Sequence, residues 1–390
     1  MSKIRVAHII TRLCRGGAQE NTFHTVRLHD RDRYEADLIC GTNTGEEGSL
    51  EEDVEAAGIQ LIRESNLVRE VNLVKDYRAL RGLTSVLRKG NYDIVHTHTS
   101  KAGFLGRLAA KYAKTPIVAH TPHGNIFDGY FSHAQTTLYI ALEQAAAKWT
   151  DKIVELTDGG IESYLRRNIG QREQYATIFS GIDLSRYGNS DADRKEFLDE
   201  LGIADGTLLV GGVGRLEPVK GFCYLLEAAL EFTECSEPIT FVHAGTGSLE
   251  NELHALAKPL GDRFRFLGLR NDISRVMAGL DILVVPSLNE GMGRVVLEAG
   301  AAGTPVIGSE VGGIPEVVHD GHTGLIVPPR DASALVTAIE GLLATPSLLN
   351  RMGENAHNFV VPDFSLENMV QHIESLYESL IQEKNIDDRR

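Results

Sequence analysis

The chain has 390 residues, 42% of them hydrophobic, and a net charge of −15. Two domains are expected, because this length exceeds the usual size of one domain and the apolar content is sufficient for two cores. The negative charge argues against general nucleic-acid binding. The cysteines, which lie far apart without metal-binding spacing, indicate reduced thiols in a cytoplasmic protein, and no apolar run reaches transmembrane length.

The first half of the chain alternates short apolar runs with amphipathic segments. Strand 4–10 precedes the pair Gly16 and Gly17, which either forms a plain tight turn or lets the backbone approach a ligand. Further strands and helices are predicted in the order strand 34–40, helix 49–57, helix 75–89, strand 93–96, helix 102–113, strand 116–120, helix 134–149 and strand 152–156. Such alternation predicts a doubly wound parallel sheet, in a first domain over residues 1–185.

The pattern breaks near Ser180, where the segment 180–194 is polar and rich in turn residues and is interpreted as an interdomain link. A second α/β domain over 186–363 follows, with its first strand at 208–213. Its other elements are predicted as helix 222–232, strand 239–244, helix 249–260, strand 264–267, strand 282–285, a helix from 294, strand 305–308 and helix 332–343. An amphipathic helix ends the chain within about 364–390.

The most informative stretch lies in the second domain, from Asp281 to Glu298. Its apolar run 282–285 predicts a buried strand, and a helical pattern begins at Arg294. Glycines on both sides of Met292 let the turn bend sharply and bring N–H groups and the positive end of the helix dipole close to a ligand. The turn therefore predicts an anion-binding site.

Two carboxylates, Glu290 and Glu298, flank this predicted anion site. Carboxylate oxygens accept hydrogen bonds from vicinal hydroxyls, so the inferred ligand carries phosphate between two polyols, as a nucleotide-sugar does. The alternative is that Glu298 is a solvated helix residue and Glu290 a loop charge.

Two cations, Arg215 and Lys220, lie on the loop after strand 208–213. If they converge on one spot, they would neutralise a diphosphate leaving group. The alternative is that they form ion pairs with Glu217 or are exposed to solvent.

Histidines follow the ends of two strands of the first domain. His96 and His98 are predicted to point to the same side of their strand, and His120 and His123 come one strand later. These histidines could bind zinc, have structural roles at His96 and His120, or contact a ligand through His123. No Glu or Cys completes a recognisable zinc ligand set.

Other nucleotide-binding chemistries are disfavoured by the glycine motifs and the acidic pairs. The glycine-rich turns at 212–217 and 245–250 lack the third glycine of a dinucleotide fingerprint, and there is no Walker lysine loop. The Asp-x-Asp pairs lie at 30–32, near a helix end, and at 191–193, in the predicted link. No metal or other cofactor is expected, with Arg215 and Lys220 supplying the positive charge.

The segments 215–221 and 290–298 resemble the signature of the retaining family 4 glycosyltransferases. The resemblance implies the GT-B fold: two Rossmann-like, doubly wound domains facing each other across a cleft, with the terminal helix packing back on the first domain. It also implies that Glu290 contacts hydroxyls of the transferred sugar, that the Met292 and Gly293 amides contact its phosphate, that Glu298 contacts the ribose, and that His123 contacts the sugar.

By the same resemblance, site roles are assigned to three groups of residues. The catalytic residues would be His123, Arg215, Lys220 and Glu290. The donor-binding residues would be Gly16, Gly17, Arg215, Lys220, Leu269, Arg270, Glu290, Gly291, Met292, Gly293, Arg294 and Glu298. The acceptor-side residues would be His98, Ser100 and Lys101.

The sequence therefore predicts a hexosyltransferase that moves a sugar, with retention, from a nucleoside diphosphate sugar to a glycan or lipid-linked acceptor in cell-surface polysaccharide synthesis. A UDP-sugar is favoured because uracil is the commonest base in the family. The alternatives are a nucleotide-sugar epimerase of GT-B-like fold and a non-catalytic protein that binds sugar nucleotides.

A cytoplasmic location is expected, with possible peripheral attachment to the inner membrane face. Residues 63–114 contain eleven basic and four acidic residues, and such a basic stretch either contacts anionic lipid or is a solvated surface whose charges are paired.

Overall fold

The computed structural model describes residues 3–42, 48–124, 127, 131–187, 190–204, 206–235 and 238–386. The chain divides into two compact units. Unit 1 runs to Gly181 and resumes at Leu366, and unit 2 spans Ile182–Ser365. These limits lie within a few residues of the domain boundaries that were expected near 185 and 364.

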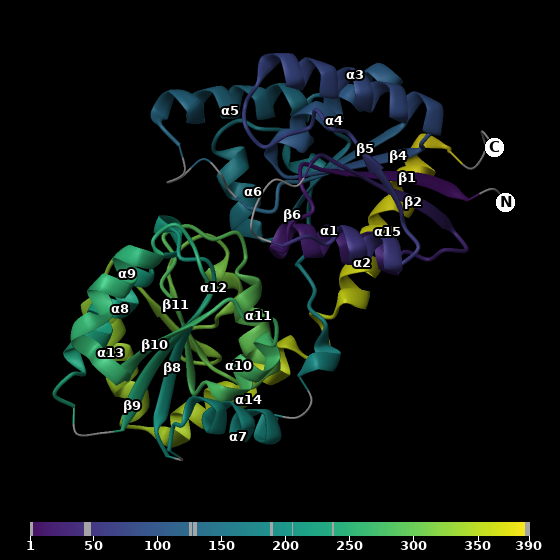
Figure 1. The fold of residues 1–390 in the computed structure, drawn as a ribbon. Coiled ribbons are helices and arrows are strands. Elements are labelled where there is room, and N and C mark those ends of the chain that lie inside the picture. Colours follow the sequence, from purple (N-terminus) through teal and green to yellow (C-terminus); the bar gives the residue numbers. More distant parts are fainter. Residues whose placement is uncertain are drawn as a thin grey trace. The chain divides into compact units, whose positions relative to one another are not determined.

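Unit 1 is built on a parallel sheet which, within the described residues, has seven strands in the order β3-β2-β1-β4-β5-β6-β7 (Figure 1). The strands are β1 Ile4–Ile10, β2 Tyr34–Cys40, β3 Gln60–Arg63, β4 Ile94–His98, β5 Ile117–Thr121, β6 Lys152–Glu155 and β7 Tyr175–Thr177. The helices are α1 Gly17–Leu28, α2 Glu51–Ala56, α3 Leu73–Gly90, α4 Ser100–Ala113, α5 His133–Ala147, α6 Asp158–Leu165 and α15 Leu366–Lys384.

The two faces of this sheet are covered by different helices because successive strand residues point to opposite sides. Ala7 and Ile9 of β1 pack in one cluster with apolar residues of α3 and α4. Ile4 and Val6 pack in another with the apolar stripe of α15, which includes Tyr377. The terminal helix is therefore part of the core of unit 1, although about 180 residues separate it from the rest of that unit.

Unit 2 repeats this architecture with six strands in its described part, in the order β10-β9-β8-β11-β12-β13. The strands are β8 Leu208–Val213, β9 Ile239–Ala244, β10 Phe264–Gly268, β11 Ile282–Val285, β12 Val306–Ser309 and β13 Gly324–Val327. The helices are α7 Ser190–Leu201, α8 Phe222–Glu231, α9 Glu250–Ala257, α10 Ile273–Gly279, α11 Arg294–Ala301, α12 Ile314–Val317, α13 Ala332–Leu343 and α14 Pro346–Val360.

The strand order of each sheet reverses direction at one place, between β1 and β4 in unit 1 and between β8 and β11 in unit 2. In open parallel sheets ligands bind outside the carboxyl ends of the strands at such a switch point. The residues that follow these four strands are therefore where a site is expected in each unit.

The structure differs from the expected elements in the segment that was interpreted as a link and in several short elements elsewhere. Helix α7 begins at Ser190, inside that segment, and packs on α10 with Phe197 fully buried. The following elements were not predicted either: strands β3, β7 and β13 and helices α6, α10, α12 and α14. Among the described residues no single helix is long and apolar enough to cross a membrane, and the one pair that passes together, α13 and α14, is bent by 101°.

A buried carboxyl at the end of β6 gives unit 1 a predicted pH dependence. Burial raises the pKa of Glu155 to about 8 from the ordinary 4.5. Between these values the unfolded chain loses the proton while the folded chain keeps it, so stability falls as pH rises, by about 1.4 kcal/mol per pH unit. Glu155→Gln, which cannot ionise, should therefore gain stability over wild type as pH rises from 4.5 to 8.

The measurement is urea unfolding at several pH values, followed by fluorescence of Trp149, the single tryptophan, which lies in unit 1. Glu173→Gln, at an exposed side chain next to β7, is the matched control. Parallel pH dependences for wild type and Glu155→Gln would contradict the assignment of a protonated Glu155.

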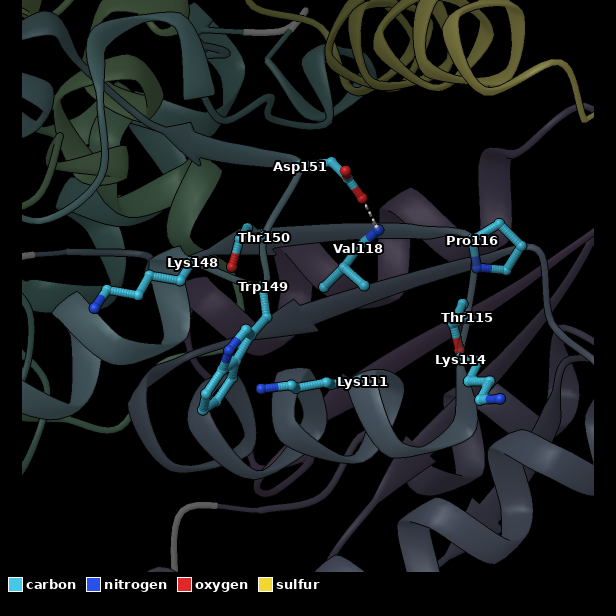
Figure 2. A pocket seen from close by; sticks show the side chains of 9 residues that line it. All are labelled: Lys111, Lys114, Thr115, Pro116, Val118, Lys148, Trp149, Thr150 and Asp151. Atoms are coloured by element: carbon cyan, nitrogen blue, oxygen red, sulfur yellow. Dashed lines mark hydrogen bonds between the residues drawn. The ribbon is translucent and has the colours of Figure 1, made fainter.

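A basic surface pocket lies at the ends of α4 and α5 in unit 1 (Figure 2). Lys111, Lys114 and Lys148 line it, and the Lys111 Nζ lies 4.2 Å from the ring centre of Trp149. Asp151 also lines the pocket but is engaged by Lys384 at 2.7 Å and by the Val118 N–H at 2.8 Å. The pocket therefore presents a surplus of positive charge beside an aromatic ring.

Candidate active site

The glycine-rich corner of unit 2 has the local structure that the sequence predicts. Strand β11 ends at Val285, and α11 begins at Arg294 with Gly293 as its N-cap. Gly293 has a φ of 80°, a conformation that favours glycine. No side chain caps the helix, so its first N–H groups are available to an anion.

A second glycine turn fixes the position of this corner. Gly312 has a φ of 54°, and a Cβ there would lie 1.8 Å from the Glu290 carbonyl oxygen. The next residue, Gly313, donates its N–H to the Gly291 carbonyl at 2.8 Å. The backbone of Glu290 and Gly291 is therefore held by the loop that follows β12, which only a glycine lets approach so closely.

Lys220 and Glu290 form an ion pair across the two loops of the switch point. Lys220 ends the short 3-10 helix Pro218–Lys220, and its Nζ lies 2.5 Å from Glu290 Oε2. Ser287 Oγ donates to the same oxygen at 3.1 Å. The side chains of Lys220 and Glu290 are 23% and 15% exposed, so both groups remain within reach of a ligand.

Arg215 lies on the same loop as Lys220 but is exposed. Glu217, the ion-pair partner considered from the sequence, accepts a hydrogen bond from Ser248 Oγ at 2.8 Å. The structure thus brings Lys220 to the glycine corner through a side-chain contact, whereas Arg215 is placed near it by its position after β8.

Three other residues expected to contact the donor, Met292, Arg294 and Glu298, lie at or near the start of α11. Arg294 and Glu298, one turn apart on α11, pair at 3.4 Å, and each is less than one fifth exposed. Met292 is 2% exposed and Gly293 is also buried, so in this structure neither residue presents its backbone at the surface. A phosphate contact at this corner therefore falls to the N–H groups that follow Gly293, and Glu298 lies in the second turn of α11.

The loop after β10 presents one apolar side chain and one engaged arginine. Leu269 is 70% exposed, whereas Arg270 pairs with Glu200 of α7 at 2.5 Å and with Asp272 at 2.6 Å. The Arg270 guanidinium therefore ties α7 to this loop, and any contact between this loop and a base falls to its backbone and to Leu269.

In unit 1 the predicted acceptor-side and glycine residues lie after β1 and β4. Gly16 is the N-cap of α1 and Gly17 its first residue, again without a capping side chain. Ser100 begins α4. Lys101 is engaged in an ion pair with Asp76 of α3 at 2.6 Å, so its charge is compensated within unit 1.

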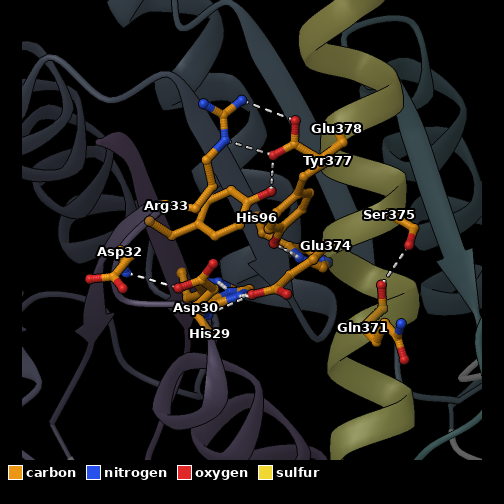
Figure 3. A network of polar contacts seen from close by, with 12 residues as sticks. His29, Asp30, Asp32, Arg33, His96, Gln371, Glu374, Ser375, Tyr377 and Glu378 are labelled. Carbon is orange, nitrogen blue, oxygen red and sulfur yellow. Dashed lines mark hydrogen bonds and ion pairs between the residues drawn. The ribbon is translucent and has the colours of Figure 1, made fainter. Parts of the chain in front are cut away.

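The histidines of unit 1 form a continuous hydrogen-bonded chain, which the sequence did not predict. His123 Nε2 lies 2.9 Å from His98 Nδ1, and His98 Nε2 lies 3.0 Å from His8 Nδ1. His8 Nε2 lies 3.2 Å from His29 Nε2. The chain ends at Glu374 of α15, whose Oε1 is 3.1 Å from His29 Nδ1 (Figure 3).

Burial favours the neutral form of three imidazoles of this chain, His8, His98 and His123. It lowers the pKa of His123 to about 3 and the pKa values of His8 and His98 well below 6.5, and neighbouring histidines add to the effect at His8 and His98. His98 is 1% exposed, so its ring is not presented to a ligand directly, and it bonds to His123. His123, in the loop after β5, is only partly buried.

His96 belongs to the cluster but not to the chain. Its ring stacks on His98 with centroids 4.4 Å apart, which confirms that the two side chains share one face of β4. Its nitrogens bond to Tyr377 Oη at 2.6 Å and Thr121 Oγ1 at 2.8 Å. His120, on the other face, bonds to Thr97 Oγ1 at 2.9 Å.

Among the described residues, His8, His96 and His98 bring ring nitrogens within 4.8 Å of one another, as three metal ligands would. The hydrogen bonds oppose this reading, since the nearest nitrogens of His8 and His98 face each other at 3.0 Å and both nitrogens of His96 are engaged elsewhere. A metal here would have to replace several of these bonds.

Sequence reasoning missed His8, His29 and Glu374. His8 was detectable in principle, because it lies in a predicted strand that pairs with the strand of His96 at a switch point. His29 and Glu374 are separated by 345 residues, and no local pattern links them.

Two Rossmann-like units, each with its polar residues at the carboxyl ends of the switch-point strands, define the GT-B class of protein. Two family models match the chain: a glycosyl transferase 4-like domain over residues 16–180 and glycosyl transferases group 1 over residues 193–359. The predicted fold class is confirmed.

Relatives of this chain carry glycosyltransferase names. A UDP-Gal:alpha-D-GlcNAc-diphosphoundecaprenol alpha-1,3-galactosyltransferase of Escherichia coli is 31% identical, covering 98% of this chain and 99% of its own. A D-inositol 3-phosphate glycosyltransferase of Corynebacterium glutamicum is 30% identical over 78% of this chain and 77% of its own. The chain belongs to the family 4 glycosyltransferases, and the predicted enzyme class, a hexosyltransferase, is confirmed.

The fold is also that of solved structures. HepE of Anabaena, crystallised in complex with UDP and glucose, superposes with a TM-score of 0.82 over 96% of this chain and all of its own, at 22% identity. At this identity the likeness shows the fold alone.

Proposed function

We propose that this enzyme binds a UDP-sugar at the glycine corner of unit 2 and transfers the sugar, with retention and without a metal ion, to a lipid-linked or other glycan acceptor. The Lys220–Glu290 ion pair beside the open N-terminus of α11 carries the proposal. The ligands of HepE and the donor and acceptor in the name of the E. coli relative support the choice of UDP-sugar and lipid-linked acceptor.

The ion pair suggests how the donor is engaged. A diphosphate entering beside the N-terminus of α11 offers Lys220 a more strongly charged partner than Glu290. Exchange of partners would place the ammonium on the leaving group and free Glu290 to accept hydrogen bonds from sugar hydroxyls. Each group would then stabilise a different part of the transition state.

Retention is proposed to occur by a mechanism in which Glu290 is not required as a nucleophile. As the glycosidic bond to the diphosphate breaks, a diphosphate oxygen takes the proton of the incoming hydroxyl on the same face of the sugar. Lys220 and the N–H groups after Gly293 would hold the charge that develops on that diphosphate.

Product analysis tests this function. The protein is incubated with UDP-hexoses and with lipid-linked or soluble glycan acceptors, with and without EDTA, and products are identified by mass spectrometry and by NMR of the anomeric centre. An α-linked product from an α-linked donor, formed equally with EDTA, is expected. An isomeric UDP-sugar formed without acceptor would indicate an epimerase, and an inverted product or loss of activity in EDTA would overturn that part of the proposal.

We further propose a cytoplasmic enzyme that docks weakly on anionic membrane through the basic stretch 63–114. Leu73, Val74 and Tyr77 at the start of α3 are 83%, 61% and 62% exposed, and exposed basic side chains follow them on the same helix. Apolar side chains beside lysines and arginines are typical of surfaces that insert shallowly into anionic bilayers. The basic pocket with Trp149 (Figure 2) lies in the same unit.

Vesicle sedimentation tests this docking. Wild-type protein should sediment with phosphatidylglycerol vesicles more than with phosphatidylcholine vesicles, and high salt should reduce the difference. Leu73→Ser with Val74→Ser should weaken sedimentation several-fold, whereas Leu138→Ser, at a 57% exposed position of α5, should not. Equal sedimentation with both lipids would remove the proposal.

A further inference from the structure

The chain of histidines in unit 1 is continuous from the loop after β5 to the terminal helix. Each link joins two ring nitrogens, at 2.9 Å between His123 and His98, 3.0 Å between His98 and His8, and 3.2 Å between His8 and His29. The stack of His96 on His98 covers one side of the chain without taking part in it, because both His96 nitrogens have other partners.

Neutral imidazoles make such a chain directional. Each neutral ring has one N–H donor and one bare nitrogen that accepts, so a chain of rings linked nitrogen to nitrogen has two arrangements, with every donor pointing toward α15 or every donor pointing toward His123. The lowered pKa values of His8, His98 and His123 agree with neutral rings.

The partner at the α15 end selects one arrangement. Glu374 Oε1 already accepts the Asp30 N–H at 2.7 Å, so it is also an acceptor toward His29 Nδ1 at 3.1 Å. A neutral His29 then carries its proton on Nδ1 and accepts at Nε2 from His8. By the same rule His98 donates Nε2–H to His8, and His123 donates Nε2–H to His98.

We propose that Glu374 is a positioning residue that acts through three histidines, His29, His8 and His98, to fix the tautomer of His123. His123 is held with its proton on Nε2, directed inward, and with Nδ1 as a bare hydrogen-bond acceptor. Such a nitrogen accepts from a hydroxyl and repels a carboxylate or phosphate oxygen, so this position selects a hydroxyl of the ligand. The relevance to the sugar rests on the proposed contact of His123 with the donor, whereas the tautomers themselves do not.

The test is the protonation of each ring nitrogen, read by NMR of protein labelled with ¹⁵N-histidine and free of donor, with His123→Asn and His29→Asn used for assignment. In wild type His123 should be protonated on Nε2 alone and His29 on Nδ1. Glu374→Leu removes the acceptor, so a second tautomer should appear at His123. Glu374→Gln keeps an oxygen under the Asp30 N–H and should retain the wild-type pattern.

Glu378→Leu is the matched control. Glu378 lies one turn further along α15 and bonds Arg33 at 2.9 Å and Tyr34 at 2.6 Å, with no histidine among these partners. It should leave all four tautomers unchanged. A wild-type His123 protonated on Nδ1, or a Glu374→Leu spectrum indistinguishable from that of Glu378→Leu, would overturn the proposal.

Three further outcomes are separable. Stoichiometric zinc that shifts the nitrogens of His8, His96 and His98 together would replace the relay by a metal centre. If wild type shows the expected tautomers but His123→Ala turns over normally, the sugar contact is removed and the relay stands. If wild type shows the opposite tautomers and His123→Ala loses turnover, the relay is removed and the sugar contact stands.

Discussion

Lys220→Ala should lower kcat/KM for glycosyl transfer about 100- to 1000-fold, the usual cost of removing one preorganised group from a developing charge. It should also weaken UDP binding about 10- to 100-fold, because a charge-assisted bond to phosphate is lost. The reason is positional: Lys220 is the cation that the structure brings by a 2.5 Å contact to the glycine corner. Steady-state kinetics and calorimetry with UDP measure the two effects.

The control for this variant is Lys258→Ala, at an exposed lysine of the same unit, which should change neither quantity. Thermal unfolding separates chemistry from folding, since the fold of Lys220→Ala should be intact. Turnover near that of wild type would be incompatible with Lys220 stabilising the leaving group.

Glu290→Ala should reduce kcat as severely as Lys220→Ala, but it should not weaken the binding of UDP. In the structure the Glu290 carboxylate is paired with the Lys220 ammonium, so UDP must displace this carboxylate to bind Lys220. Removing the carboxylate frees the cation and removes a negative charge next to the diphosphate. UDP affinity is therefore expected to stay equal or increase while transfer, which needs the hydroxyl contacts of Glu290, is lost.

The comparison is made by calorimetry with UDP and by turnover of a UDP-hexose, with Glu310→Gln, at an exposed carboxylate after β12, as the control. Weakened UDP binding in Glu290→Ala would show that the ion pair with Lys220 builds the nucleotide site and does not compete with it.

These expectations separate what local sequence predicts from what it does not. The buried strand β11, the turn at Gly293 and helix α11 followed from an apolar run, two glycines and a change of period, all within 20 residues. The pairing of Lys220 with Glu290 was not predicted, because it joins loops 70 residues apart. Sequence reasoning placed the two groups on different parts of the donor and did not anticipate that they neutralise each other.

Two other misses have tertiary causes. Helix α7 has a polar, turn-rich sequence, and it is held by packing of Phe197 and by ion pairs such as Glu200 with Arg270. The row of hydrogen-bonded histidines depends on strand pairing between β1 and β4 and on α15, a helix at the C-terminal end of the polypeptide. Such contacts depend on topology, so local periodicity gives the elements but not these partners.

The most direct test of the account is a crystal structure of the enzyme with bound UDP. The diphosphate should lie within hydrogen-bonding distance of Lys220 Nζ and of the N–H groups that follow Gly293, with Glu290 released from Lys220. A diphosphate bound elsewhere, with Lys220 still paired to Glu290, would contradict it.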